Sequence, residues 1–547
     1  MTTSTTVPAV VRTSWLPLAV VVLTQIQASF AVNALTVSMG PITTDLDTPA
    51  TTVGTAITAS TFAMAAFILL GAKLGAKFGS RRMFQLAIIV HALGMLGVAF
   101  AFSPVILFIA QAASGAVIAL ISPALVVFIA TNFSGAQQAR AIGFLAAAIP
   151  AAGVLALLIA GSFASTIGWR WSFVLVAALG AINLLLSFRI KKVPSIPDVQ
   201  IDWVGALIAA VSVILISFGS NGLSSWGVLL ASDDAPFTIL GLSPAPVLLV
   251  LGVIGAQLFF VWTRRRKAAG RPQLFDLDVL ASPGDKATTL AMGAMLFVGT
   301  AANFLIPLYI QIVQGRSSFE TSIAVIPYTL SIFVASSVIA SMYRRFAPRN
   351  IARFGFVVVA LGLILLAFTI RNDWGQIVIV LGLIVLGLGQ GSIVALVFNT
   401  LLASSPKSLA GDVGAWRGLV HNISGSIGIA VASVFATTVL TTLVAAGLAD
   451  RGDVLTPELT EQVNLDSVDF VTNDHLKEVL AGTTATPEQV ESAVELNEEA
   501  RLRALQISLL GLAAVAALAI VPAGRMPGFT PGDIPAELST GRESRQA

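Results

Sequence analysis

The chain has 547 residues, of which 56% are hydrophobic and only 11% are charged, against about 25% charged in an ordinary soluble domain. Its mean hydropathy of +0.89 excludes a water-soluble globular protein. The net charge of +3 comes from basic residues scattered in short clusters, a pattern that does not indicate nucleic-acid binding. There is no cysteine, which excludes disulfides and thiol chemistry, and the three histidines lie far apart. We therefore expect neither a metal site nor a cofactor.

Apolar runs of about 20 residues recur along the chain, long enough to cross the ~30 Å hydrocarbon core of a bilayer as helices. Barrel strands would alternate polar and apolar residues instead, and this chain never sustains such alternation. The first run has no small-residue cleavage site near its end, so we interpret it as a spanning helix and not a signal peptide. The sequence predicts fourteen spans, at 15–40, 53–72, 83–101, 105–129, 141–163, 170–189, 204–220, 245–263, 288–313, 321–343, 353–370, 375–402, 413–447 and 502–523.

The distribution of Lys and Arg predicts the orientation of these spans. Every connection that follows an even-numbered span is basic, including 73–82, 189–192 and 264–271, whereas the opposite connections hold few basic residues and many acids. Because positive loops stay in the cytoplasm, we expect a multi-pass protein of the inner (plasma) membrane with both termini cytoplasmic. One missed or invented span would reverse the asymmetry from that point on.

Residues 450–500 differ from the rest, with thirteen Asp or Glu and two Lys or Arg. The stretches TPELTEQV and TPEQVESAVELNEEARLR resemble short helices with a Thr cap and a Pro in the first turn. The first interpretation is a solvated extracytoplasmic loop with some helix. The alternative is a cap over the outer mouth or a docking site for an extracytoplasmic partner.

Five motifs carry a family resemblance: GAKLGAKFGSRR (71–82), GWRWSF (168–173), IDWVGA (201–206), FLIPLYIQIVQGRSSFETSIAVIP (304–327) and AGDVGAWRGLVHNISGSIGIAV (410–431). In this order they resemble the major facilitator superfamily and, within it, the fourteen-helix drug:proton antiporter branch. The resemblance implies an all-α membrane protein that works by alternating access about a mid-membrane site. It implies six-helix halves at 1–195 and 271–547, with two inserted helices at 196–270.

The loop between the second and third spans carries the superfamily's signature. Gly75 and Gly79 are expected to permit a tight turn. Lys77, Arg81 and Arg82 are expected to hold the loop in the cytoplasm and to pair with helix C-termini. For the two arginines, a plain positive-inside charge is an equal alternative.

Several positions depart from the family. The signature's Asp is Ala76, the first span's Asp is Val32, and the fourth span's Arg is Gln111. Proton coupling needs a titratable group at membrane depth, and the first six spans contain no deep Asp or Glu. His91 in the third span is either a buried hydrogen-bonding residue or a proton carrier. Coupling has therefore moved, or the chain is not a standard proton antiporter.

Polar residues in the spans predict the transport site. At the start of span thirteen, Arg417 and His421 share a helix face, and either serve coupling or substrate binding or, with Asp412, form a structural pair. These three are the coupling candidates. Neutral amides, each alone also explained as interhelical hydrogen bonding, together predict a cavity with apolar walls: Gln25, Gln27, Asn33, Gln111, Asn303, Gln311, Gln390 and Asn399.

The leading functional hypothesis is a secondary transporter that exports hydrophobic or amphiphilic compounds, as in multidrug efflux. The alternatives are a transporter of an endogenous lipid-like metabolite or envelope component without standard proton coupling, and a degenerate membrane scaffold. No phosphate-binding loop is present, so neither ATP-driven transport nor an enzyme is expected. The expected partners are the small substrate and membrane lipids, and the expected functional unit is a monomer.

Overall fold

The computed structural model describes residues 15–48, 50–223, 225–232, 235–316, 318–342, 345–371, 377–450 and 473–527. Across these ranges the chain is almost entirely helical, and its only β structure is two isolated bridges. In them, thirteen helices are long and apolar enough to cross a bilayer, and the shorter apolar helix Ile326–Ile339 supplies a fourteenth. The prediction of an all-α membrane protein with fourteen spans is confirmed.

Every predicted span corresponds to one helix or to a broken pair of helices. The first six spans are α1 (Leu16–Val37) with α2 (Met39–Asp45), α3 (Ala50–Phe78), α4 (Ser80–Ala99), α5 (Pro104–Asn132), α6 (Gly135–Thr166) and α7 (Arg170–Ser187). The next two are α8 (Trp203–Gly222) and α9 (Pro244–Ala268). The last six spans are α10 (Pro283–Leu308) with η2 (Tyr309–Val313), α11 (Ser318–Ala324) with α12 (Ile326–Met342), α13 (Pro348–Thr369), α14 (Ile377–Ser404), α15 (Ala410–Asp450), and α18 (Pro487–Leu518) with α19 (Ile520–Gly524). The short helices η1 (Leu277–Leu280), η3 (Lys407–Leu409) and α17 (Asn473–Ala481) lie in the connections between spans.

Local capping explains where several helices begin. The Ser282 hydroxyl accepts a hydrogen bond from the Asp285 backbone N–H at 3.0 Å, and the Asp285 carboxylate accepts one from the Ser282 N–H at 3.2 Å. This capping box starts α10, with a proline in its first turn. Thr486 caps α18 in the same way, so the prediction of a Thr cap followed by Pro is confirmed there. The other predicted stretch, 456–463, lies outside the described residues.

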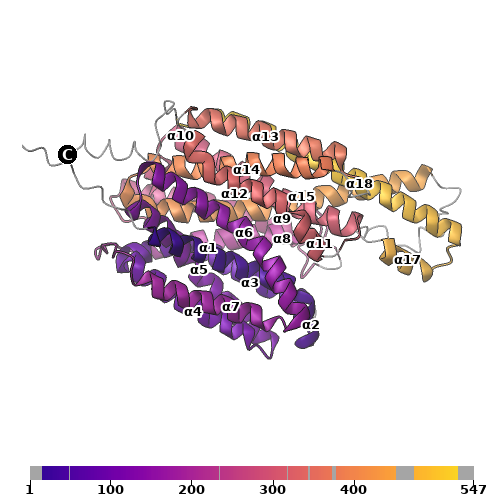
Figure 1. Ribbon diagram of the computed structural model, residues 1–547, viewed down its shortest axis with the longest axis horizontal. Coiled ribbons are helices and arrows are strands. Elements are labelled where there is room, and N and C mark those ends of the chain that lie inside the picture. Colours follow the sequence, from indigo (N-terminus) through magenta and orange to yellow (C-terminus); the bar gives the residue numbers. More distant parts are fainter. Residues whose placement is uncertain are drawn as a thin grey trace, which may run out of the picture.

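The helices pack in two groups (Figure 1). In one group α3 packs on α5, α4 on α5 and α7, and α1 on α6 and α7. In the other, α14 packs on α12 and α13, α15 on α10, and α18 on α13 and α15. The groups meet where α6 contacts α12 and α14, and where α15 contacts α3 and α5. Small residues permit such close approach; for example, a side chain on Gly143 would collide with the Ser336 carbonyl.

Helices α8 and α9 pack on each other, and α8 packs against α3 and α15. Buried Asp202 fastens their ends together: its carboxylate accepts hydrogen bonds from the Gly205 N–H and from Trp262 Nε1, both at 3.0 Å. Arg266 Nε lies 3.4 Å from the same carboxylate. The pair is thus one unit attached to both helix groups.

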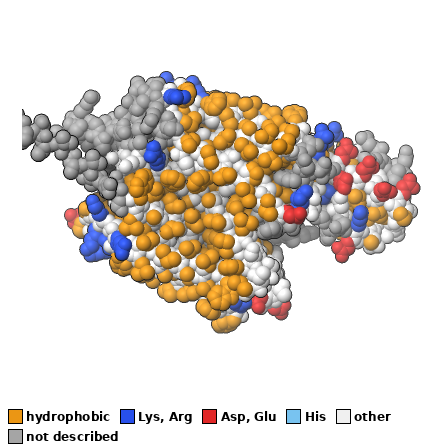
Figure 2. All heavy atoms as spheres, viewed as in Figure 1, with side chains coloured by type: hydrophobic (Ala, Val, Ile, Leu, Met, Phe, Trp, Pro, Cys, Tyr) orange, Lys and Arg blue, Asp and Glu red, His pale blue; other side chains and the backbone are white. Residues whose placement is uncertain are grey.

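The molecular surface has three zones (Figure 2). A wide hydrophobic belt covers the middle, Lys and Arg gather at one end, and Asp and Glu gather at the other end over α17 and the start of α18. We name the end where α3 meets α4 the basic end; it carries the exposed side chains of Arg82, Lys191 and Arg264. The belt fits the apolar interior of a bilayer.

Candidate functional site

A cavity of about 430 Å³ lies between α1 and α6 on one side and α10, α12, α14 and α15 on the other. This volume is within the range of small-molecule binding sites, ~300–1,000 Å³. Most of the wall is apolar, with Ile149, Val154 and Leu157 from α6, Met292, Met295 and Leu296 from α10, and Val394, Val397 and Phe398 from α14. The cavity therefore sits at the interface of the two helix groups.

Three neutral amides from different helices interrupt the apolar wall: Asn33, Asn303 and Gln390. The Nδ2 of Asn33 donates to the Ser29 carbonyl at 2.7 Å, and that of Asn303 donates to the Gly299 carbonyl at 3.0 Å. Gln390 Oε1 accepts a 2.6 Å hydrogen bond from the Tyr328 hydroxyl, while its buried Nε2 has no partner among the described residues. Tyr328 also lines the cavity, although the sequence analysis did not predict it as a site residue. A tyrosine within an apolar span could have indicated such a role.

Arg417 and His421 lie on successive turns of α15, and both line the cavity. The Arg417 guanidinium carbon lies 4.9 Å from the centre of the Phe398 ring, a cation–π contact. Throughout the described chain no Asp or Glu forms an ion pair with Arg417, and none lines the cavity. The cavity thus contains a positive charge for which the described part of the chain supplies no counter-ion.

Asp412 has a different role from Arg417. Its two carboxylate oxygens lie 2.9 and 3.0 Å from Lys73 Nζ on α3. Asp412 and Arg417 are five positions apart, which places them about 140° apart around an α-helix. The alternative that Asp412 and Arg417 form a structural pair is therefore wrong: the ion pair of Asp412 joins α15 to α3 instead.

The other predicted amides do not line this cavity. Gln27 is buried and accepts from Asn183 Nδ2 at 2.8 Å, which ties α1 to α7. Gln25 donates to the Ser29 hydroxyl at 3.1 Å, and Asn399 donates to the Ala139 carbonyl of α6 at 3.4 Å. Gln111 is buried in α5, and Gln311 is half-buried in η2.

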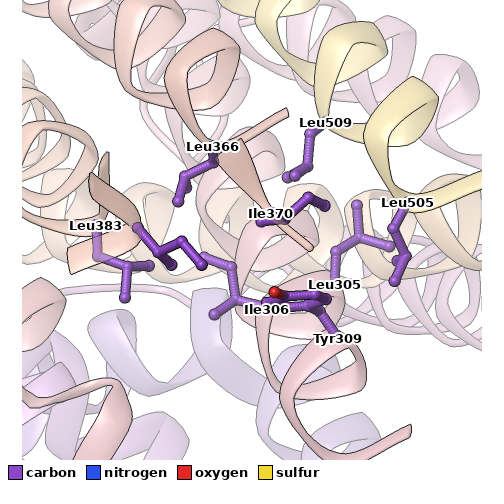
Figure 3. A pocket seen from close by; sticks show the side chains of 9 residues that line it. Leu305, Ile306, Tyr309, Leu366, Ile370, Leu383, Leu505 and Leu509 are labelled. Atoms are coloured by element: carbon purple, nitrogen blue, oxygen red, sulfur yellow. The ribbon is translucent and has the colours of Figure 1, made fainter. Parts of the chain in front are cut away.

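A second cavity, of about 10 Å³, is lined by Leu305, Leu366, Leu383, Leu505 and other apolar side chains (Figure 3). A buried water needs roughly 10–15 Å³ and two or more polar partners. Tyr309 supplies the only polar side chain of this wall. We interpret this space as a packing gap between α10, α13, α14 and α18.

Comparison with known proteins identifies the family. The model of the Major Facilitator Superfamily matches residues 21–429 of the 547. The chain belongs to this superfamily. A family of transporters and a hydrophobic belt of spanning helices make it a multi-pass integral membrane transporter.

Named relatives and solved structures of the superfamily resemble the chain along most of its length. The puromycin resistance protein pur8 of Streptomyces alboniger is 27% identical over 453 residues, which cover 80% of this chain and 84% of the relative. The tetracenomycin C resistance and export protein of Streptomyces glaucescens is 24% identical over 378 residues, 68% of this chain and 66% of that protein. The proton:xylose symporter XylE superposes with a TM-score of 0.58 at 13% identity, covering 96% of this chain and 98% of that chain, which shows a shared fold.

The superfamily signature loop lies at the basic end. Gly79 joins α3 to α4 with φ of 93°, whereas Gly75 lies inside α3. Arg81 donates to the Phe188 and Ile190 carbonyls just beyond α7, at 2.7 and 2.8 Å. Lys77 lies 5.8 Å from the Phe78 ring centre, and Arg82 is exposed. Arg81 therefore pairs with a helix C-terminus, whereas Arg82 fits the simpler positive-inside interpretation.

His91, in α4, lies far from solvent. Its side chain is fully buried, and its Nδ1 lies 2.7 Å from the Ser114 hydroxyl oxygen. It does not line the cavity. The geometry fits the interpretation of a buried hydrogen-bonding residue.

Proposed function

We propose that this transporter exports hydrophobic or amphiphilic drug-like compounds by alternating access, using the 430 Å³ cavity as its substrate site. The observation that carries the proposal is the location of this cavity between the two helix groups, with apolar walls and three amides. Apolar walls with a few polar groups suit ligands of this kind. The relatives named for puromycin and tetracenomycin C resistance support the same substrate class.

Alternating access requires two halves that move about the site. We propose residues 1–195 and 271–547 as these halves, with 196–270 as inserted helices. The grouping of helix contacts supports this division. At the basic end α15 packs against α3 and α5, and the Lys73–Asp412 ion pair joins the proposed halves there. We propose that these contacts close the cavity on that side.

We further propose that the basic end faces the cytoplasm, that the protein lies in the plasma membrane with both termini inside, and that it works as a monomer. The clusters of Lys and Arg at that end support this orientation. A role of 450–500 as a cap or docking site for an extracytoplasmic partner stays a prediction.

Arg417 and His421 are our proposed sites of substrate or proton coupling, because they are the basic side chains that line the cavity among the described residues. Asp412 contributes differently, as the α15 partner of Lys73 in closing the basic end. The signature residues Gly75, Lys77, Gly79, Arg81 and Arg82 are proposed to control movement at the same end.

The proposal is tested by filling the cavity. Gly153 lines it, and a Cβ atom there would meet only the Asn33 side-chain oxygen within 4 Å, at 3.9 Å. We expect Gly153→Trp to abolish most transport of a lipophilic dye into proteoliposomes under an imposed proton gradient, with an internal pH probe recording proton flux. Leu207→Trp is the matched control, because Leu207 is 65% exposed on α8 within the hydrophobic belt.

Different outcomes separate the hypotheses. Dye movement that follows the gradient in the control but not in Gly153→Trp supports coupled export through this cavity. Dye movement that does not depend on the proton gradient supports transport but contradicts proton coupling. Dye movement that Gly153→Trp leaves unchanged contradicts the assignment of the site, and absence of movement for every amphiphile favours the lipid-specific or scaffold hypothesis.

A further inference from the structure

The ionisable groups of the cavity are unbalanced in charge. Its wall contains Arg417 and His421 but no Asp or Glu. A charge at membrane depth is costly unless it meets a partner or faces a polar cavity. The Arg417 guanidinium makes a cation–π contact with the Phe398 ring, and such a contact offsets only part of the cost of desolvation.

The neighbouring acids cannot supply the missing partner. Asp412, the nearest carboxylate in sequence on α15, is engaged by Lys73 and lies on another face of the helix. The Asp202 carboxylate accepts from Trp262 and lies 3.4 Å from Arg266. Asp285 belongs to the cap of α10, where its Oδ2 accepts from the Ser282 hydroxyl, and neither acid lines the cavity. No carboxylate of the described residues thus balances Arg417, which leaves a group that enters the cavity as its counter-charge.

The position of Arg417 defines where that group would bind. Helix α15 begins at Ala410 beside the basic end, so Arg417 lies about 10 Å along the helix. Gln390 and Phe398 are eight residues apart on α14, about 12 Å along one helix face. The cation thus lies nearer the basic end, and the amide of Gln390 lies deeper.

An anion beside Arg417 would meet favourable conditions. Guanidinium offers several N–H donors in a plane that matches a carboxylate or sulfonate. The apolar residues around it, including Val394 and Val397, lower the local dielectric and strengthen the attraction. The same walls accept an alkyl or aromatic body, while a cationic amphiphile would be repelled.

We propose that the cavity selects amphiphiles that carry an anionic group, with Arg417 binding that group and His421 next to it on the following turn. The inference rests on the proposed function, because it specifies the substrate class of the same cavity. It makes Arg417 a determinant of selectivity in addition to a coupling candidate.

The test measures binding, which needs no transport cycle. The full chain in nanodiscs of neutral lipid is titrated with 11-(dansylamino)undecanoate and with its methyl ester, following dansyl fluorescence. The two probes differ only in the charged group. We expect the acid to bind about tenfold more tightly than the ester, and Arg417→Gln to remove this preference, so that the variant binds acid and ester alike.

Two further variants test whether the effect of Arg417→Gln is specific to the charge at this position. Arg417→Lys retains the charge without the planar donor array, so it should retain part of the preference even if Arg417→Gln folds poorly. Arg503→Gln is the matched control, because it makes the same substitution at an arginine that lies on the surface, with 64% of its side chain exposed. It should bind both probes as the wild type does.

The outcomes distinguish this inference from the proposed function. Equal affinity of the wild type for acid and ester, or a preference that survives Arg417→Gln, overturns the inference even if dyes are transported. Failure of the folded wild type to bind the acid overturns it as well. An Arg417-dependent preference without any transport in proteoliposomes supports the anion site and rejects the export function.

Discussion

Two glycines of one loop, Gly75 and Gly79, have different structural roles. Gly79 has a φ of 93°, a conformation that L-residues with a side chain rarely adopt. Gly75 lies within α3, where a Cβ would touch only Ser80, at 3.7 Å or more. The expectation that both glycines form the turn therefore holds for Gly79, while Gly75 precedes the turn by one helical turn.

We expect Gly79→Ala to lower the free energy of unfolding by about 1–2 kcal/mol, because alanine is strained at positive φ. Gly75→Ala, its control, should be neutral or slightly stabilising, since alanine favours a helix. Thermal unfolding of the purified protein in detergent measures both. Equal effects of the two substitutions would mean that the loop adopts another conformation.

At the scale of elements, α15 and α18 extend past the hydrophobic belt. Helix α18 runs unbroken over Pro487–Leu518, so the described part of the acidic segment after Thr486 is a helix continuous with the last span and not a loop. Helix α17 packs against α18 (Figure 1). Arg501 is fully buried there, and its guanidinium donates to the Ile312 carbonyl in η2 at 3.2 Å and to Asn473 in α17.

Arg501 therefore links three elements at the acidic end. We expect Arg501→Leu to lower the melting temperature by a few degrees, because it leaves buried acceptors such as the Ile312 carbonyl unsatisfied. Arg503→Leu, two residues away and mostly exposed, should have little effect. Similar melting temperatures for both variants would show that the link does not stabilise the fold.

At the scale of the whole molecule, the halves meet at the basic end through helix contacts and one ion pair. Lys73 and Asp412 have side-chain exposures of 13% and 10%, so water weakens their attraction less than at the surface. The pair joins α3 in one proposed half to α15 in the other. Opening of this end must separate the two charges.

We expect Lys73→Met to favour opening, raising by about tenfold, or ~1.4 kcal/mol, the rate at which a thiol in the cavity is labelled from the basic end. The chain has no native cysteine, so Thr300→Cys provides a single reporter on the cavity wall. Lys267→Met removes an exposed ion pair at the same end and is the control. Unchanged labelling in Lys73→Met would exclude the ion pair as a gate.

The orientation of the molecule is tested by two matched substitutions. Ala269, after α9, and Ala481, in α17, are both exposed and lie at opposite ends. In intact cells an impermeant maleimide should label Ala481→Cys at once and Ala269→Cys only after permeabilisation. The reverse pattern would invert the proposed topology.

The residue pattern by itself determined the spans and the family. Apolar runs of bilayer length predicted all fourteen spanning segments, because the bilayer constrains each helix locally and independently of its neighbours. Motifs in chain order predicted the superfamily that the comparison confirms. The amides within the apolar spans also predicted a cavity with polar groups among apolar walls, but not which of these amides face it.

Only the tertiary structure decided that distribution, because it depends on how each helix is rotated against its neighbours. Asn33, Asn303 and Gln390 face the cavity, whereas Gln27 and Asn399 bond to adjacent helices. Spacing along α15 predicted that Arg417 and His421 share a helix face. Only the packing of α15 against α3 shows that Asp412 pairs with Lys73 and that no carboxylate lies beside Arg417 in the cavity wall. The pairing of charges 339 residues apart in sequence is a property of the assembled bundle, and no local pattern encodes it.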